Sequence, residues 1–571
     1  MKTGIRGAAV PEVAGHNDRG GWISVLLVIL AVAYLGVAYS SLRQDSATVD
    51  EFGHIPAGHN ILSTGDFGYA EFHPPLLNIL SALPMAFLQL HPDTSRPAPF
   101  PDAGYSFWYN GYNFAQRFAG DYQKIVVAAR VVTVVQVLLL GVLLFFWAHD
   151  FGGRRPALAG LLAAAVVWFS PGILAHSRLA ALDAGIAFFM ALAIWGFHRF
   201  LRCQNAGWLI VCGVLVGVAQ LCKGTALYLY PILVVLAVAW RHFHEDCHFG
   251  RLTLKVAGIF LTSLVVINAG YLFQGTCTSL GEMDFLSPTL ADLQRGLPAG
   301  IPVPLPRVYV ESFDRQLHES ATGYGASLFG VYYPEGVWYY YLALLGVKTP
   351  IPLMLLAVTA ILIFTRVAPR MTFQTVLLLF PPVFIIILFS FFSGKQIGTR
   401  VLLPAAPLFW LWVSLVITNA RHPRWRLGLF GILGLWMVAV DVRAYPDYLS
   451  YFNTFVRSPG QAARITTDSN LDWGQDLIRL REFMKQRGIA KVQLLYFGRV
   501  DPSIYGISYE LPKGAPKPGY LVVSSTLFDR DYPLTDHGRI VRIVEVRLDR
   551  NPKARRVGFI GRTLQLYEIS E

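Results

Sequence analysis

The sequence predicts a mainly α-helical membrane protein with many transmembrane helices, followed by a small soluble α/β domain. Of the 571 residues, 54% are hydrophobic and only 15% are charged, and the mean hydropathy is +0.45. This composition is far from that of a soluble globular protein. Through residue 444 the chain repeats apolar runs, most of them close to the ~20 residues that cross a bilayer. Beyond residue 444 the apolar runs shorten to the length of strands.

Eleven apolar segments are expected to span the membrane as helices. They are residues 22–42, 125–148, 156–175, 180–199, 207–222, 225–240, 254–272, 349–365, 373–392, 401–418 and 427–443. The first is too long for the apolar part of a signal peptide and lacks a clear cleavage site, so it is expected to remain as an anchor. Residues 76–90 are apolar but short and contain Pro84, so they are expected to lie on or dip into the outer face.

The basic residues predict the orientation of these spans. If the N-terminus is cytoplasmic, every cytoplasmic loop carries at least two Lys or Arg residues, as the positive-inside rule requires. These loops are residues 152–155, 199–202, 241–255, 366–370 and 421–426. They largely account for the net charge of +12, so a nucleic-acid partner is not expected. Two large loops, about 43–124 and 273–347, and the segment 445–571 then lie on the outer side.

Residues 1–444 are expected to form the transmembrane domain, and residues 445–571 a small α/β domain. In the latter, DSNLDWGQDLIRLREFMKQRG predicts a capped amphipathic helix that ends at Gly488. The runs KVQLLYF, GYLVVSS, RIVRIVEV and TLQLYEI predict strands. Two interpretations of DSNLDWGQDL stay open. It caps the helix and docks it onto the outer loops, which is favoured, or it binds an acceptor through Trp473, Asp468, Asp472 and Asp476.

The unusual charged residues gather at the outer ends of the predicted spans, whereas the midplanes carry almost none. A transporter is expected to place charges, broken helices or repeats near the midplane, so this distribution favours chemistry at the membrane surface. The residues concerned, including those of the first outer loop, are Asp50, Glu51, Glu71, His73, Arg178, Asp183, Lys223, Lys348, Lys395 and Arg400. For each basic residue taken singly, contact with lipid headgroups is the simpler alternative.

Three of these positions have a more specific context. Lys348 precedes TPIP, whose prolines are expected to start a helix at the interface, so its ammonium is expected beside a helix N-terminus, where anions are favoured. The stretch Gly394–Arg400 is short, flanked by glycine and basic, and is a candidate for holding a phosphate. For Asp183, a structural ion pair with a neighbour such as Arg178 is as well supported as a functional role.

A metal site is a weaker alternative in the first outer loop. The side-chain types suit a divalent ion, but their spacing is not diagnostic, so no cofactor or metal is expected to be required. The residues are His54, His59, His73, Asp50, Glu51 and Glu71. The five cysteines form no CxxC pair, which argues against zinc and redox motifs.

Several stretches resemble a known family. VDEFGHIPAGHNILSTGDF and HPPL lie in the first outer loop, AHSRLAALDAG at the fourth span, and WYYYLALLGVKTPIPL at the eighth. IGTRVLLPAAP follows at the tenth span, and AYPDYLSYFN with DSNLDWGQDL opens the C-terminal segment. In this order they resemble the GT-C glycosyltransferases that use lipid-linked sugars. In particular, they resemble the bacterial relatives of protein O-mannosyltransferases and of the aminoarabinose transferases that act on lipid A.

The resemblance implies roles for individual residues. Asp50 would be the general base that takes the proton from an acceptor hydroxyl, and Asp183 would help to position that site. Lys348, Lys395 and Arg400 fall where basic residues face the lipid phosphate. The other expected substrate-binding residues are Glu51, His73, Arg178 and Lys223. The aminoarabinose transferases have a Glu-Lys pair before their paired prolines, whereas this chain has Phe72-His73, so a lipid A acceptor is not implied.

The resulting expectation is an inverting membrane glycosyltransferase of the GT-C type. It would move a sugar from a polyprenyl-phosphate donor to a hydroxyl of a glycan, lipid or protein on the outer side of the membrane. The setting would be a bacterial inner membrane, with a cytoplasmic N-terminus and the C-terminal domain in the periplasm. The alternatives are a lipid or solute transporter, or a non-catalytic member of the same fold that binds glycan or lipid.

Overall fold

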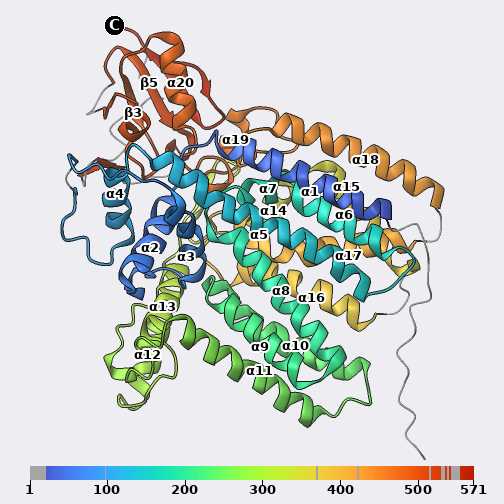
Figure 1. Ribbon diagram of the computed structural model, residues 1–571. Helices are drawn as coiled ribbons and strands as arrows, with labels where there is room; N and C mark the ends of the chain where they lie inside the picture. The colour runs from blue at the N-terminus through green and yellow to red at the C-terminus, as the bar shows by residue number, and fades with distance from the viewer. Residues whose placement is uncertain are drawn as a thin grey trace, which may run out of the picture.

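A computed structural model shows a bundle of long helices with a small sheet near the C-terminus (Figure 1). It describes residues 21–96, 98–367, 371–420, 423–512, 516–528, 534–536, 539–541 and 553–571. The expected loops 366–370 and 421–426 and the expected strand RIVRIVEV fall partly outside these residues. The mainly helical class and the small C-terminal sheet are therefore as predicted.

Every predicted span coincides with a helix or a helix pair. The elements are α1 (Gly21–Leu42), α5 (Tyr122–Asp150), α6 (Pro156–Phe169), α7 (Pro171–Ser177), α8 (Leu182–Cys203), α9 (Ala206–Gln220), α10 (Leu229–Phe243), α11 (Phe249–Gly270), α14 (Tyr340–Lys348), α15 (Ile351–Val367), α16 (Phe373–Phe391), the 3-10 turn η5 (Thr399–Ala405), α17 (Ala406–Asn419) and α18 (Pro423–Ala444). The apolar runs of the sequence thus locate the helices of the bundle.

Seven helices in the described part of the chain are long and apolar enough to cross a membrane. The number rises to nine when each of two bent pairs is one span: α6 with α7, bent by 64°, and α14 with α15, bent by 114°. Helix α9 covers one of the eleven predicted spans but has only 15 residues. Prolines mark both bends, since Pro171 begins α7 and Pro350 precedes α15. The chain is thus a multi-pass membrane protein.

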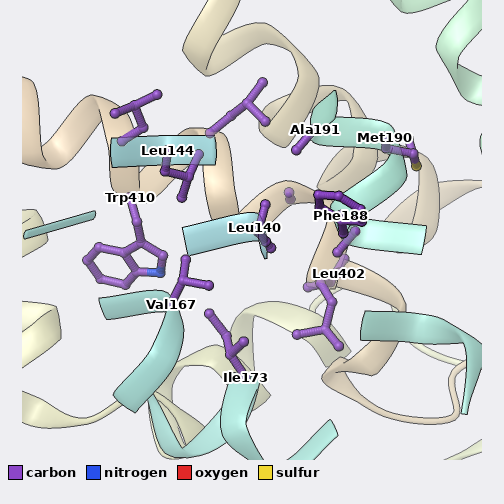
Figure 2. Close-up of a cluster of buried hydrophobic side chains, with 14 of the residues drawn as sticks. Leu140, Leu144, Val167, Ile173, Phe188, Met190, Ala191, Leu402 and Trp410 are labelled. Carbon is purple, nitrogen blue, oxygen red and sulfur yellow. The ribbon is translucent and has the colours of Figure 1, made fainter. Parts of the chain in front are cut away.

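The core of the bundle is apolar and tightly packed. Leu140 and Leu144 of α5 face Val167 of α6, Phe188 of α8 and Trp410 of α17 in one buried cluster (Figure 2). By contrast, many large apolar side chains of α1, α11 and α18 are exposed. A helix that is apolar on its outer face suits lipid rather than water.

Shorter elements between the long helices gather at one end of the bundle, on the left in Figure 1, and we call this the loop end. They are the helices α2 (Glu51–Thr64), α3 (Leu76–Ala82), α4 (Phe107–Arg117), α12 (Pro288–Gly296) and α13 (Arg307–Thr322). In the chain, the 3-10 turn η2 (Leu83–Phe87) follows α3, and a hairpin of β1 (Ala326–Leu328) and β2 (Val331–Tyr333) follows α13. The segment expected to lie on the membrane, residues 76–90, forms α3 and η2. Helix α2 packs closely on α3, because a Cβ at Gly58 would lie 1.9 Å from the carbonyl oxygen of Asn78.

The C-terminal segment folds into a five-stranded mixed sheet in the order β4-β3-β5-β9-β8. The strands are β3 (Val492–Leu495), β4 (Tyr509–Glu510), β5 (Gly519–Ser524), β8 (Ala554–Ile560) and β9 (Leu564–Ile569), with a separate pair, β6 (Leu534–Asp536) and β7 (Arg539–Val541). Two helices, α19 (Pro459–Ile465) and α20 (Leu477–Arg487), precede the sheet, and α20 ends at Gly488 in the left-handed conformation, as expected. Strands β4, β6 and β8 were not predicted, whereas β7 coincides with the start of the predicted strand RIVRIVEV.

The C-terminal segment is packed onto the loop end rather than hanging free of it. Leu477 and Leu480 of α20 share a buried apolar cluster with Phe52 of α2 and Ile125 of α5. The predicted side-chain cap at the N-terminus of α20 is wrong, however. Asp476 precedes α20 but its side chain does not cap the helix, and it accepts hydrogen bonds from Thr563 at the start of β9 instead. Docking, not capping, is therefore what DSNLDWGQDL does in this fold.

Candidate active site

Asp50 stands at the start of α2, just after α1 has ended and the chain has turned at the loop end. Its backbone carbonyl accepts hydrogen bonds from the N–H groups of Gly53 and His54, so the helix itself holds it. Its carboxylate contacts the Nη1 of Arg400, which enters from the start of η5. The Asp50 side chain is 24% exposed and that of Arg400 only 7%. Asp50 is therefore the partly exposed member of an ion pair whose cation is buried.

Asp183 joins this pair from the first turn of α8. Its Oδ2 lies 3.3 Å from the Nη1 of Arg400, and its Oδ1 lies 2.6 Å from the Nζ of Lys223. Both carboxylates suggested by the resemblance thus share one guanidinium. The alternative pair of Asp183 with Arg178 is wrong, because Arg178 pairs elsewhere. We call Asp50, Asp183, Lys223 and Arg400 the ionic cluster.

Lys395 lies beside the cluster, held by α13. Its ammonium donates to Gln316 at 2.8 Å and to the carboxylate of Glu319. Burial lowers the pKa of Lys395, and the nearby Glu319 carboxylate opposes that shift. Gln316 also donates to the carbonyl of Phe72 at 3.0 Å, next to His73. Through Gln316, the loop 394–398 is therefore linked to the segment that carries His73, whereas its expected phosphate-binding role stays a prediction.

His54 and His73 form a stacked pair close to the cluster, with ring centroids 5.9 Å apart. Burial lowers the pKa of His54 to about 4, with the Asp50 carboxylate opposing the shift. Burial also puts the pKa of His73 well below its usual value, helped by the charge of Lys223. Both imidazoles are thus neutral at pH 7. Their Nδ1 atoms have no hydrogen-bond partner among the described residues.

Glu51 faces inward, away from the open side of Asp50. It is fully buried and pairs with the equally buried Arg130 of α5 at 2.7 Å. Its carboxylate also accepts the N–H of Thr48 at 2.9 Å and the N–H of Ala180 at 2.7 Å. The carboxylate is thus fully used in tying the start of α2 to α5 and to the turn before α8. Arg130 was missed by the sequence analysis, although a lone charge inside the apolar run 125–148 was a usable signal.

Arg178 and Lys348 are also buried and bound by the protein itself. Arg178 pairs with Asp45 at 2.6 Å and lies over the ring of Tyr448. Lys348 ends α14, and α15 begins three residues later at Ile351, so the prolines start a helix there as expected, whereas the anion site stays a prediction. Its ammonium donates to the carbonyls of Leu449 at 2.9 Å and Asn470 at 2.6 Å. Both cations fasten the C-terminal segment to the bundle.

The C-terminal segment reaches the ionic cluster through Trp473. This side chain is 1% exposed, and the guanidinium of Arg400 lies 4.3 Å from its ring centroid. A ring that is covered in this way has no free face, so the predicted stacking of Trp473 on a sugar is not what the structure supports. Glu71, a residue between α2 and α3, pairs with Arg315 of α13 at 2.8 Å.

A divalent metal finds no ready ligand set in the described part of the chain. There, no three His, Cys, Asp or Glu side chains lie together in a way that would hold an ion. The three histidines proposed as ligands do not converge: His54 stacks on His73, whereas His59 packs edge-on against Phe114 and Phe118. What the site offers is three carboxylates and three cations, those of the ionic cluster with Lys395 and Glu319.

Comparison with known proteins supports the resemblance drawn from the sequence. The family model described as dolichyl-phosphate-mannose-protein mannosyltransferase matches residues 102–278, a range that contains Asp183 and Lys223. The chain is thus similar to that family over this range. None of the curated proteins compared with the chain matches it.

Several solved glycosyltransferase structures are also similar. The ArnT protein of Cupriavidus metallidurans bound to undecaprenyl phosphate is 13% identical, with 96% of this chain and 98% of that chain covered and a TM-score of 0.48. Its apo form is 15% identical, with 74% and 66% covered and a TM-score of 0.46. The Saccharomyces cerevisiae Pmt1–Pmt2 complex bound to the sugar donor is 20% identical, with 44% and 33% covered and a TM-score of 0.32. The chain spans about two thirds of the apo ArnT chain and one third of the yeast chain.

Proposed function

We propose that this protein is a membrane glycosyltransferase that uses a sugar linked to a polyprenyl phosphate. The sugar would pass, with inversion, to a hydroxyl of a glycan, lipid or protein acceptor. Asp50 would act as the general base. The observation that carries the proposal is the ionic cluster, in which a partly exposed carboxylate, the buried cation of Arg400 and the half-buried cation of Lys223 meet at the loop end from distant parts of the chain.

The chemistry needs few groups because the donor already has a leaving group. Asp50 accepts the proton of the acceptor hydroxyl, and the oxygen attacks the anomeric carbon. The bond from that carbon to the phosphate oxygen breaks, and the polyprenyl phosphate leaves as an anion. Positioning of the two reactants and electrostatic stabilisation of the leaving phosphate supply most of the rate. A single displacement inverts the anomeric configuration.

The cations next to Asp50 suit the leaving phosphate. Arg400 can present planar N–H donors to phosphate oxygens, whereas Lys223 acts as a compact charge. In the structure each is neutralised by a carboxylate, Arg400 by Asp50 and Asp183, and Lys223 by Asp183. Lys395, paired with Glu319, is a third cation of this kind. In the proposal an arriving phosphate exchanges places with these carboxylates and leaves Asp50 free to act as base.

Four other predicted residues take supporting roles in this proposal. Glu51, Arg178 and Lys348 hold the walls of the site, because their charged groups are buried against protein partners. His73 is neutral and stands where the aminoarabinose transferases have a lysine, so it offers a hydrogen bond rather than a charge. The proposal that the donor sugar is carried on a lipid phosphate is supported by the description of the matching family, which names a mannose carried on dolichyl phosphate.

The proposed setting follows from the distribution of basic residues. The loop end would face the periplasm of a bacterial inner membrane, with the N-terminus in the cytoplasm. Donor lipid would then reach the ionic cluster from the bilayer, and acceptor from the aqueous side. A transporter is the less suited alternative, because the ionic cluster lies at one end of the bundle and not across its middle.

The proposal is tested with a panel of labelled sugars on undecaprenyl phosphate, supplied to membranes that contain the protein. We expect label to move from one of these donors into an acceptor fraction, with the opposite anomeric configuration in the product. Nucleotide sugars should give no transfer in membranes depleted of undecaprenyl phosphate. Retention of configuration, or transfer directly from a nucleotide sugar, would contradict the proposal.

A further inference from the structure

We propose that Trp473 is a positioning residue of the active site, and that the C-terminal segment is therefore part of that site. The inference rests on the proposed function. Trp473 would fix the positions of Asp50 and Arg400 relative to each other. The ring of Trp473 would hold the Arg400 cation, and the backbone of Trp473 would hold the chain next to Asp50. The contacts that carry this inference come from four parts of the chain.

The ring of Trp473 supports Arg400. The guanidinium carbon lies 4.3 Å from the ring centroid, and the ring is almost fully buried. A cation over an indole face is attracted most strongly where water is excluded. The edge of His176, from α7, packs against the same ring at a centroid distance of 6.2 Å. Trp473 is thus fixed between the bundle and the cation that bridges Asp50 and Asp183.

The backbone of Trp473 supports Asp50. Its carbonyl accepts a hydrogen bond at 3.1 Å from the N–H of Val49, the residue directly before Asp50. A second bond runs in parallel, from the N–H of Ser46 to the carbonyl of Gln475 at 2.9 Å. The stretch before α2 is therefore held against residues 473–475 by two backbone hydrogen bonds. A shift of Trp473 would move Arg400 and Asp50 together.

Hydrogen bonds join the turn just before Trp473 to the segment that carries Arg400. Asn470 accepts the N–H of Thr399 at 3.1 Å, and Ser469 donates its hydroxyl to the carbonyl of Ile397. Gly398, which lies between Ile397 and Thr399, has φ +119°, and a Cβ there would lie 2.5 Å from the Ser469 hydroxyl oxygen. Only glycine accepts both that conformation and that approach. This explains the glycine of the IGTR sequence.

Ion pairs fasten the same region to the bundle. Arg479 of α20 contacts Asp45 at 3.0 Å and Asp447 at 2.7 Å, and Asp45 in turn contacts Arg178. These links come from the C-terminal segment, the first outer loop and the bundle. Trp473 therefore sits in a rigid frame, which is what a positioning residue requires.

The test compares Trp473→Leu with Trp473→Phe, and uses Trp436→Leu as the control. Trp436 is exposed on α18 and takes part in none of the contacts described above. Because Leu keeps the backbone bond to Val49 but removes the ring face, the rate constant for transfer is expected to fall about tenfold or more in Trp473→Leu. Phe restores part of the face, so Trp473→Phe should recover much of the rate. The control should transfer sugar like the wild type.

A double-mutant cycle with Arg400→Gln separates positioning from mere stability. If Trp473 acts through Arg400, adding Trp473→Leu to Arg400→Gln causes little further loss of transfer. Additive losses in kcat, or a Trp473→Phe variant no better than Trp473→Leu at equal folded yield, would overturn the inference. A wild type that transfers no sugar from any polyprenyl-phosphate donor would instead overturn the proposed function beneath it.

Discussion

The guanidinium of Arg400 contacts the carboxylate of Asp50, although 350 positions separate them in the chain. The same Nη1 atom lies 3.3 Å from Asp183. A cation shared by two carboxylates is held in place before any substrate arrives, so its charge needs little reorganisation during the reaction. This preorganised cation, with Asp50 exposed beside it, is the basis of the account given above.

Loss of Arg130 is expected to destabilise the fold strongly. Replacing it by Met leaves the carboxylate of Glu51 buried and uncompensated, which costs about 3–5 kcal/mol in comparable cases. The double variant Glu51→Gln with Arg130→Met should be more stable than Arg130→Met alone. Thermal unfolding of the protein in detergent measures both. Arg295→Met is the control, because its pair with Asp292 is exposed and such pairs contribute at most about 1 kcal/mol.

His54 is expected to make stability depend on pH. Its folded-state pKa, lowered by burial to about 4, lies below the unfolded value of 6.5. The unfolded chain therefore binds more protons between pH 4 and 6.5, so the free energy of unfolding rises with pH through this window. Above pH 6.5 this contribution is constant.

The check is thermal unfolding from pH 4.5 to 7.5 with His54→Gln. The variant should lose part of the wild-type slope below pH 6.5. His91→Gln, which alters an exposed histidine, should keep it. Identical slopes in wild type and His54→Gln would show that His54 is not buried in its neutral form.

Arg479 is expected to hold the C-terminal segment on the bundle. Arg479→Met removes contacts to Asp45, Asp447 and Asp476, and should lower the free energy of unfolding by about 1–3 kcal/mol. Arg481→Met, on the same helix, loses only an exposed pair with Glu482 and should change stability little. Equal effects of the two variants in thermal unfolding would refute this role.

Much of the fold was predictable because apolar runs and turns are local signals. The positions of the bundle helices, the C-cap at Gly488 and strands β3, β5 and β9 follow from patterns of a few residues. Strand β4 has only two residues and β8 is rich in arginine, so neither carries the alternating pattern that marks a strand.

The site was only partly predictable, because its contacts join distant segments. The sequence singles out Asp50, Asp183, Lys223, Lys395 and Arg400 as charges near membrane ends, and the structure brings these five side chains to the loop end. No local pattern says that Lys348 binds carbonyls of the C-terminal segment, or that Arg178 pairs with Asp45. Those partners are set by packing between elements far apart in the chain. Glu319 and Trp473 show the same limit, because each belongs to the site only through the cation that it contacts. Glu319 contacts Lys395, and Trp473 contacts Arg400.

The most direct test of the central claim is sugar transfer by purified wild type, Asp50→Asn and Asp66→Asn. Asp66 lies in the same loop, and within the described part of the chain its carboxylate accepts hydrogen bonds only from Gly68 and Tyr105, so it serves as the matched control. The account predicts that Asp50→Asn lowers kcat by about 10²–10⁴ at equal folded yield, as loss of a general base does, whereas Asp66→Asn stays near wild type. Equal kcat in wild type and Asp50→Asn would contradict the assignment of Asp50 as the base.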